Sequence, residues 1–294
     1  MPTHRHFLAL SQIPLKMTQQ LKVPSTSRLV LEAAMPLYTT PLQQRYIESI
    51  DFNETSHIFY DLKRYYPLVI DSICLRKQSI RAMLQERITR MAGQQVILLG
   101  AGLDPLSLYL LENYRQELSR IIEIDNGYIE EKQQLYASII PGEPLIRFVK
   151  CDITDTVLLW SKLLENGYQQ DAPAIIVFEG VIHYISNDAF INTMKLFKTP
   201  NRRNLVMLDY TLSEEEVPAT FLPYHQGILR MLQAYVGMPL NVNNHADMAG
   251  IIYQLDATLE NLEPMCETER KFTGHNKLFH APGEGVIEML SFSL

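Results

Sequence analysis

The sequence predicts an α/β fold with a doubly wound, mostly parallel sheet. From residue 95 onward, short apolar runs alternate with segments that have helical periodicity. Residues within each run are apolar at consecutive positions, as in strands that are buried on both faces of a sheet. The first run ends at GAG, a glycine turn of the kind that joins a strand to a helix. This combination is typical of a parallel sheet covered by helices on both faces.

The residues before this alternation are expected to form a helical lead-in over 1–94. Apolar residues recur at helical spacing over 25–38. A second helix is expected between Pro67 and Gly93, because proline is common at the start of a helix and glycine just after its end. The core then covers 95–294.

Five strands are expected in the core before an insertion. They lie at 96–99, 121–124, 145–149, 175–178 and 205–208. Prolines, glycines and aromatic residues crowd 217–244, so this segment is expected to be a partly helical insertion after the fifth strand. It either covers the ligand crevice or packs on the sheet as a surface excursion. A last strand is expected over 286–294.

Composition excludes several classes of protein. The chain has 26 Lys and Arg residues against 33 Asp and Glu residues, which argues against a nucleic-acid partner. Cys74, Cys151 and Cys266 are far apart and lack CxxC spacing, so no disulfide framework is expected. The apolar part of the amino-terminal segment is broken at Pro14, and no run approaches the roughly 20 residues of a membrane span. A cytoplasmic protein without a membrane partner is expected.

The glycine turn and an acid after the next strand predict a ligand that contains ribose. Gly100 and Gly102, with Ala101 between them, allow the backbone to approach a ligand closely. Asp125 follows about 20 residues later, where a carboxylate accepts hydrogen bonds from ribose hydroxyls. Glu123 shares its face of the strand, but Asp125 is nearer to the strand end.

A second acid bears on the identity of that ligand. A dinucleotide fingerprint needs a third glycine where this chain has Pro105, so NAD is disfavoured. Asp152 ends the third strand and could accept the exocyclic amine of adenine. It could equally cap the following helix, a role for which Thr154 and Asp155 compete.

Four segments, in order, carry a family resemblance: GAGLD, IIEIDNGYIEEKQQLY, VKCDITD and IIVFEGVIHYIS. Over about 76–197 the chain resembles the leucine carboxyl methyltransferase family, whose members depend on S-adenosylmethionine (SAM). The resemblance implies a class I methyltransferase (Rossmann-like) sheet with one antiparallel strand. It also implies the cofactor-binding residues, which are Gly100, Ala101 and Gly102 at the methionine part, Asp125 at the ribose, Asp152 and Ile153 at the adenine, and Glu179 at the floor of the site.

The family also has an arginine in the helix before the first strand, and Arg76 is its match here. A guanidinium can clamp a carboxylate through two hydrogen bonds, so Arg76 is expected to bind a carboxylate of the acceptor or of SAM. The alternative is a solvated residue on a helix that also carries Lys77 and Arg81. The family's terminal elements, which usually shape the acceptor pocket, are only faint at 26–34 and not evident at 276–279.

The expected reaction is methyl-ester formation on a carboxylate of a small molecule, a carrier-bound intermediate or a peptide. An ionised carboxylate needs no general base. A hydroxyl acceptor would benefit from one, and His183 beside Tyr184 is the nearest candidate, unless His183 is only a hydrogen-bonded structural residue. A hydroxyl O-methyltransferase and a SAM-binding module without catalysis remain the alternatives. No metal is expected, because His275 and His280 lack the i, i+4 spacing of a helical zinc pair.

Overall fold

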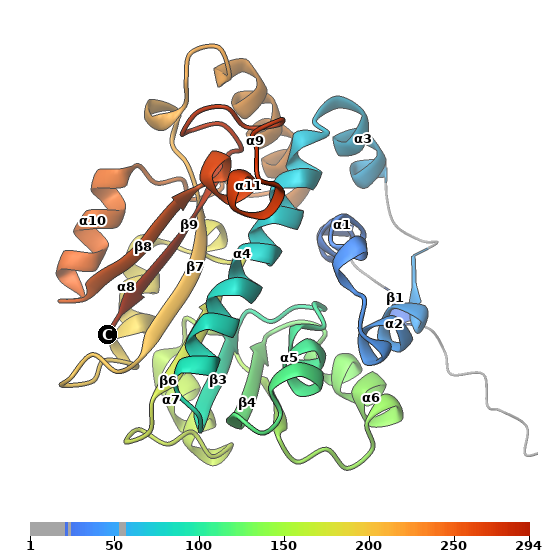
Figure 1. The fold of residues 1–294 in the computed structure, drawn as a ribbon, viewed down its shortest axis with the longest axis vertical. Helices are drawn as coiled ribbons and strands as arrows, with labels where there is room; N and C mark the ends of the chain where they lie inside the picture. Colours follow the sequence, from blue (N-terminus) through green and yellow to red (C-terminus); the bar gives the residue numbers. More distant parts are fainter. Residues whose placement is uncertain (1–20, 23–24, 53–56) are drawn as a thin grey trace, which may run out of the picture.

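The computed structural model describes residues 21–22, 25–52 and 57–294, and its centre is a seven-stranded sheet (Figure 1). The strand order is β5-β4-β3-β6-β7-β9-β8. The strands are β3 (Gln94–Leu99), β4 (Leu118–Asp125), β5 (Ile146–Lys150), β6 (Ala174–Phe178), β7 (Leu205–Thr211), β8 (Thr258–Pro264) and β9 (Ile287–Ser293). All five expected strands of the core are present, and so is the last one. β8 is an additional strand at the sheet edge.

The sheet is mostly parallel, with one reversed strand. β3 pairs in parallel with β4 on one side and with β6 on the other. β9 runs antiparallel to both of its neighbours, β7 and β8. The chain therefore winds outward in both directions from β3, and the crevice at the carboxyl ends of β3 and β6 is the expected place for a ligand. The doubly wound fold predicted from the apolar runs is confirmed.

Helices cover both faces of the sheet. Val96 and Leu98 point into a core shared with α4 (Leu68–Arg90), α5 (Leu106–Tyr114) and α6 (Ile129–Ile139). Ile97 and Leu99 point into the opposite core, which is shared with α7 (Thr156–Glu165), α8 (Asn187–Lys195) and α10 (His245–Gln254). Since successive residues of a strand face opposite sides, a strand buried on both faces has to be apolar throughout.

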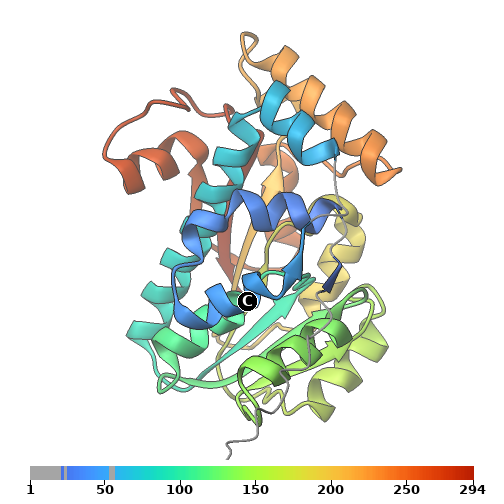
Figure 2. The same ribbon diagram turned by 90° about the vertical axis from the view of Figure 1, so that its right-hand side faces the viewer.

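The expected lead-in contains several short elements before α4. They are β1 (Leu21–Lys22), α1 (Ser25–Ala33), the 3₁₀ turn η1 (Met35–Leu37), α2 (Pro41–Glu48), β2 (Ile50–Asp51) and α3 (His57–Tyr65). Figure 2 shows α1 between α3 and α2, in front of the sheet. α4 packs on β7 and β9 and so belongs to the cover of the sheet. The division of the chain after residue 94 stays a prediction.

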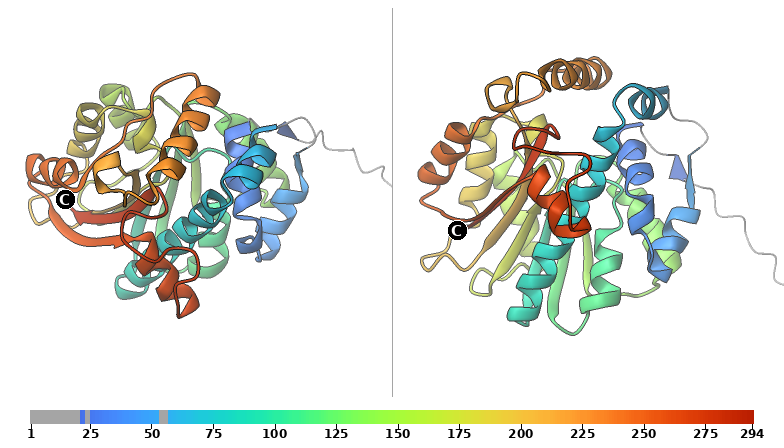
Figure 3. Two further views of the ribbon diagram at one scale, coloured as in Figure 1. Left: turned by 90° about the horizontal axis from the view of Figure 1, so that it is seen from above. Right: turned by 45° about the horizontal axis from the view of Figure 1, so that its top comes forward.

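The expected insertion contains one long helix, α9 (Leu222–Val236), which ends at the left-handed Gly237. α9 packs beside α3, and Figure 3 shows the two helices together. The ring of Tyr66, which follows α3, lies 5.4 Å from that of Tyr224 in α9. Ile228 and Leu229 join a third apolar cluster with residues of α1, α3 and α4. The expected insertion and the lead-in therefore share an apolar cluster.

The rest of the chain completes the edge of the sheet. α11 (Met265–Thr273) follows β8 and packs against α4. Cys74, Cys151 and Cys266 are free thiols. None of the helices in the described part of the chain combines the length and the hydropathy of a membrane span.

Candidate functional site

The glycine turn after β3 has the backbone conformation that only glycine adopts without strain. Gly100 has φ +68° and Gly102 has φ +49°. A Cβ atom at Gly100 would lie 2.6 Å from Cγ2 of Val181, so a side chain there would push the turn away from the loop after β6. A Cβ atom at Gly102 would meet no atom within 4 Å. The backbone at Gly102 is therefore open to a ligand.

Asp125 ends β4 beside this turn, and backbone N–H groups hold both of its oxygens. Oδ2 accepts a hydrogen bond from the N–H of Gly102 at 2.8 Å, and Oδ1 accepts one from the N–H of Gly127 at 2.7 Å. A carboxylate oxygen can accept more than one hydrogen bond, so each oxygen keeps capacity for a hydroxyl. This arrangement fits the ribose-binding role expected for Asp125.

Glu123 is buried on the side of the turn away from the cavity and is not among the residues that line it. Its side chain is 0% exposed and forms an ion pair with Lys132, whose side chain is also 0% exposed. Ser107 donates a hydrogen bond to Glu123, and Lys132 donates one to the backbone carbonyl of Asp104 at 2.6 Å. Burial raises the pKa of Glu123, although Lys132 and Ser107 oppose this. The acid that sequence reasoning set aside therefore supports the turn.

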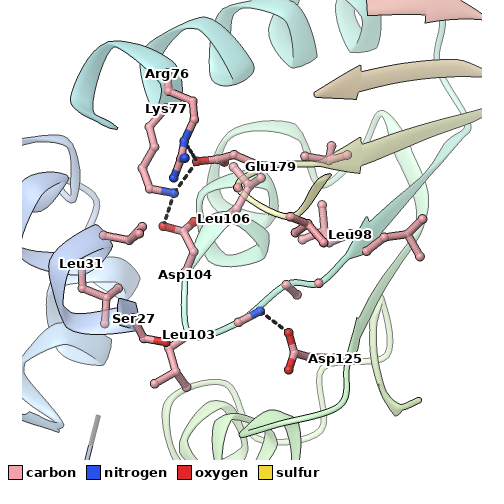
Figure 4. Close-up of a pocket in the computed structure, with 18 of the residues that line it drawn as sticks. Ser27, Leu31, Arg76, Lys77, Leu98, Leu103, Asp104, Leu106, Asp125 and Glu179 are labelled. Carbon is pink, nitrogen blue, oxygen red and sulfur yellow. Dashed lines mark hydrogen bonds and ion pairs between the residues drawn. The ribbon is translucent and has the colours of Figure 1, made fainter. Parts of the chain in front are cut away.

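Arg76 is buried and holds two acids. Its Nε atom lies 3.1 Å from Oε1 of Glu179, and its Nη1 atom lies 3.2 Å from Oδ2 of Asp209 (Figure 4 shows the Glu179 contact). Asp209, on β7, also accepts a hydrogen bond from the N–H of Gly180 at 2.6 Å. Burial lowers the pKa of Arg76, but Asp209 and Glu179 more than reverse this, so the guanidinium stays charged. The alternative of a solvated Arg76 is wrong.

Lys77 reaches the same cluster, and sequence reasoning missed it. Its Nζ atom lies 2.8 Å from Asp104 and 2.8 Å from Glu179. Asp104 also accepts a hydrogen bond from the hydroxyl of Tyr38 at 2.7 Å. Burial on its own would raise the pKa of Asp104, but Lys77 and Tyr38 lower it to about 2. The only sequence signal for this ion pair was the acid that follows the glycine turn, Asp104 of GAGLD.

A cavity of about 260 Å³ lies between these groups. It brings together most of the predicted site residues, which are Arg76, the turn at 100–102, Asp125, Glu179 and Tyr184. Ser27, Val30 and Leu31 of α1 close one side of it. The lead-in therefore supplies part of the wall, whereas α9 supplies none of the described lining residues.

Asp152 and Ile153 do not line this cavity. Oδ1 of Asp152 accepts hydrogen bonds from the N–H and the hydroxyl of Thr154, both at 2.8 Å, and Ile153 is buried among apolar residues. Asp155 is the N-cap of α7, because its side chain accepts a hydrogen bond from the N–H of Leu158. The contact of Asp152 and Ile153 with adenine stays a prediction.

His183 lies beside the cavity and not on its wall. It belongs to the 3₁₀ turn η2 (Ile182–Tyr184), and its ring packs on that of Tyr184 with centroids 4.3 Å apart. Nδ1 is buried without a hydrogen-bond partner in the described part of the chain. Burial and the charge of Arg76 lower the pKa of His183 to about 4, against an opposing effect of Asp209. The ring is therefore neutral near pH 7.

The strand order, the single reversed strand, and a glycine turn that donates a hydrogen bond to the acid at the end of the next strand define a class I SAM-dependent methyltransferase. The sequence profile of the leucine carboxyl methyltransferase family matches residues 27–198, more than half of the chain. The chain belongs to this family, and it is a SAM-dependent methyltransferase. A search among curated proteins found no match.

Solved structures share the fold at low sequence identity. A candidate methyltransferase from Thermobifida fusca superposes with a TM-score of 0.60 at 14% identity, over 92% of this chain and 95% of its own. A DUF574 family protein from Streptomyces avermitilis gives 0.56 at 10% identity, over 91% and 96%. A SAM-dependent methyltransferase from Mesorhizobium loti gives 0.51 at 14% identity, over 75% and 98%.

The residues of the cavity fit the cofactor. Three carboxylates (Asp104, Asp125 and Glu179) face two cations (Arg76 and Lys77) among the described lining residues. This excess of negative charge suits the sulfonium and ammonium groups of SAM. Asp125 and the open backbone at Gly102 suit its ribose and its methionine part.

Proposed function

We propose that the protein is an O-methyltransferase that forms a methyl ester on a carboxylate. The acceptor is a small-molecule acid, or a carboxylate on a carrier or a peptide. One observation carries this proposal: the cavity wall offers two cations and, among its described residues, no histidine, the side chain whose ordinary pKa lies nearest to neutral pH. An ionised carboxylate is the oxygen acceptor that needs no such base.

Two acids of the wall, Asp104 and Glu179, already form ion pairs, and Asp104 is a poor base for this reason. Asp104 has a pKa of about 2, because Lys77 and Tyr38 outweigh the effect of burial. Glu179 contacts both Arg76 and Lys77. A carboxylate with a pKa as low as that of Asp104 has little tendency to accept a proton from a hydroxyl.

The other candidates for a base are no better placed. Burial raises the pKa of the Tyr184 hydroxyl, so that group stays protonated. His183 has a pKa of about 4 through burial and the charge of Arg76, and its ring does not line the cavity. A hydroxyl acceptor would therefore meet no matched base in this site.

The residues of the site position the acceptor and exclude water. SAM supplies a methyl group that its sulfonium charge has already activated. Arg76 has five N–H donors, of which Nε and Nη1 contact acids, so donors remain for a ligand carboxylate. Val30, Leu31 and Val181 give the wall an apolar part that keeps water away from the reacting groups. The net charge of −7 argues against a nucleic acid as the partner.

The test is a screen of carboxylic acids with isotope-labelled SAM. We expect a labelled product that releases methanol under mild alkali, as methyl esters do and methyl ethers do not. An alkali-stable product would reject the proposal in favour of hydroxyl methylation. Binding of SAM without any labelled product across acid and hydroxyl acceptors would instead support a binding module without catalysis.

A further inference from the structure

A second cavity, of about 410 Å³, lies at the other end of the sheet. The cavity beside the glycine turn adjoins the carboxyl ends of β3 and β6, whereas this one adjoins the start of β7 at Leu205 and the end of β9 at Ser293. α4 and the edge strand β8 supply further parts of its wall, and in Figure 1 β9 and β8 lie to the left of α4. Cavities of this size hold small molecules in many proteins.

The sheet face beneath α4 changes from apolar side chains to hydroxyl groups at this cavity. Leu205 and Met207 of β7 pair with Ser293 and Ser291 of β9. On the opposite face β9 carries Phe292, which is buried in an apolar core. A sheet face covered by a helix is normally filled by apolar side chains, so the two small serines leave a hollow between β9 and α4. Neither hydroxyl forms a hydrogen bond to another described residue, and both are therefore available to a ligand.

Arg87 of α4 brings a positive charge without an acidic partner to this cavity. Its Nη2 atom donates a hydrogen bond to the carbonyl of Arg203 at 2.9 Å, while its Nε atom is buried without a partner in the described part of the chain. The other cations of the wall have acids, which are Glu86 for Arg90, Glu263 for Lys271 and Asp256 for Arg202. A buried donor without a partner is costly, so an anion that reaches Arg87 binds favourably.

We propose that this cavity is a second ligand site, which binds a small organic acid as a monocarboxylate with an apolar body. The carboxylate accepts hydrogen bonds from Arg87 and from the serine hydroxyls. The apolar body packs on Met83 and Met207, whose flexible side chains adapt to ligands of different shape. A second negative charge is disfavoured by the acids of the same wall, which are Glu86, Glu260 and Glu263.

The site is separate from methyl transfer. Arg87 follows Arg76 on the same helix by about 16 Å along the axis, so an acid bound at Arg87 lies outside the cavity beside the glycine turn. The proposal therefore holds whichever group the enzyme methylates, and it fails or stands independently of the proposed esterification.

Methyl NMR of the protein labelled at its methionine methyl groups can locate the ligand. Met83 and Met207 line this cavity, while no methionine is among the described residues that line the cavity beside the glycine turn. Benzoate and benzamide serve as a charged and a neutral probe of the same shape. We expect saturable shifts of both methionine signals with benzoate, and binding of benzamide that is about 10- to 100-fold weaker, as for the loss of a hydrogen bond between charged groups.

Two substitutions on α4 test the role of Arg87. Arg87→Gln should weaken benzoate by about 10- to 100-fold and leave benzamide within about threefold. Arg90→Gln is the matched control, because Arg90 lines the same cavity but is 73% exposed and paired with Glu86, so benzoate should stay within about threefold. Methionine signals that do not respond to benzoate, or an unchanged benzoate affinity in Arg87→Gln, would overturn the proposal. Tighter binding of inorganic phosphate than of benzoate would overturn the choice of an organic monocarboxylate.

A third substitution tests the hollow itself and does not alter any charge. Ser291→Leu places a larger side chain in the space beside Met207, so we expect the shifts caused by benzoate to be lost. Thermal unfolding confirms that this variant is folded. Benzoate that still shifts the signal of Met83 with its original affinity would show that the ligand lies elsewhere, and would overturn the proposal.

Discussion

Two buried lysines contact Asp104 and serve different purposes. Lys132 contacts its backbone carbonyl and pairs with Glu123, and both side chains of that pair are 0% exposed. Lys77 contacts its carboxylate, which remains 16% exposed at the cavity. Lys132 is sealed within the protein and supports the turn, whereas the two acids that pair with Lys77 line the cavity and stay partly exposed. Both lysines are buried, so the difference between them is whether the acids that they contact are exposed to the cavity.

The largest expected effect is the loss of stability in Lys132→Met. This change leaves Glu123 buried without its cation, and breaking a buried ion pair in this way costs about 3–5 kcal/mol. Lys77→Met should cost less, because water in the cavity can reach Asp104 and Glu179. Urea denaturation of both variants measures the difference in the free energy of unfolding. If Lys77→Met were the more destabilised, the distinction between the two lysines would not hold.

The two glycines of the turn offer a second comparison between a position packed against the protein and a position open to the cavity. In Gly100→Ala the new Cβ would contact Val181 at 2.6 Å, so we expect overpacking of about 1–3 kcal/mol in addition to backbone strain. Gly102→Ala meets no atom within 4 Å and should show only the strain of about 1–2 kcal/mol from its positive φ. Thermal unfolding measures both variants. Val181→Ala in the Gly100→Ala background should recover part of the loss, and no recovery would exclude the clash as its cause.

The acids that pair with the two lysines, Asp104 with Lys77 and Glu123 with Lys132, should contribute to stability with opposite dependence on pH. The pKa of Asp104 is lowered from 3.8 to about 2, because Lys77 and Tyr38 outweigh burial, so its contribution is present above pH 3.8 and lost as pH falls through about 2. The shift corresponds to about 2.5 kcal/mol at most. Burial raises the pKa of Glu123, so its contribution is present below the unfolded pKa near 4.5 and is lost as pH rises through the folded pKa.

Unfolding curves between pH 2 and pH 8 measure these contributions. Relative to the unmodified protein, Asp104→Asn should show a smaller loss of stability on acidification below pH 4. Glu123→Gln should show a smaller loss as pH rises above 4.5. Curves of the same shape for both variants would contradict the opposite signs.

The smallest effect is expected for His183→Ala. Its ring lies beside the cavity wall, and burial and the charge of Arg76 lower its pKa to about 4. We therefore expect turnover to fall by less than about tenfold, whereas loss of a catalytic base lowers it about 10²–10⁴-fold. Arg76→Ala is the matched comparison and should abolish most turnover. Steady-state kinetics on the acid found in the screen measure both. A loss of 100-fold or more in His183→Ala would give that ring a catalytic role.

The parts of the fold that follow local rules could be predicted from sequence. The strands of the core are apolar throughout, and the turn after β3 needs glycine at positive φ, so both are visible in short segments. β8 was missed because it is an edge strand, and the segment TLENLEP carries three exposed positions at its start. Its pairing with β9 depends on residues that lie far along the chain.

The candidate site shows the same limit. Asp125 stands at a fixed distance from the glycine turn, so spacing alone points to it. Arg76 was found through a family resemblance, while Lys77 looked like a solvated neighbour. Glu179 lies 102 residues after Lys77, and Asp209 lies 133 residues after Arg76. No local pattern could show that these groups meet. The absence of Asp152 from the cavity wall likewise depends on how the loop after β5 folds back on Thr154.

The reversed strand β9 also sets the order in which the sheet can be completed. β9 lies between β7 and β8 and pairs with both, and β8 has no other neighbour in the described sheet. Synthesis proceeds from the amino terminus, so β7 leaves the ribosome with one open edge and β8 follows with no partner. Both wait until β9 has emerged. An open strand edge invites pairing with other chains, so the interval before β9 inserts is the period in which a newly made molecule is most exposed to aggregation.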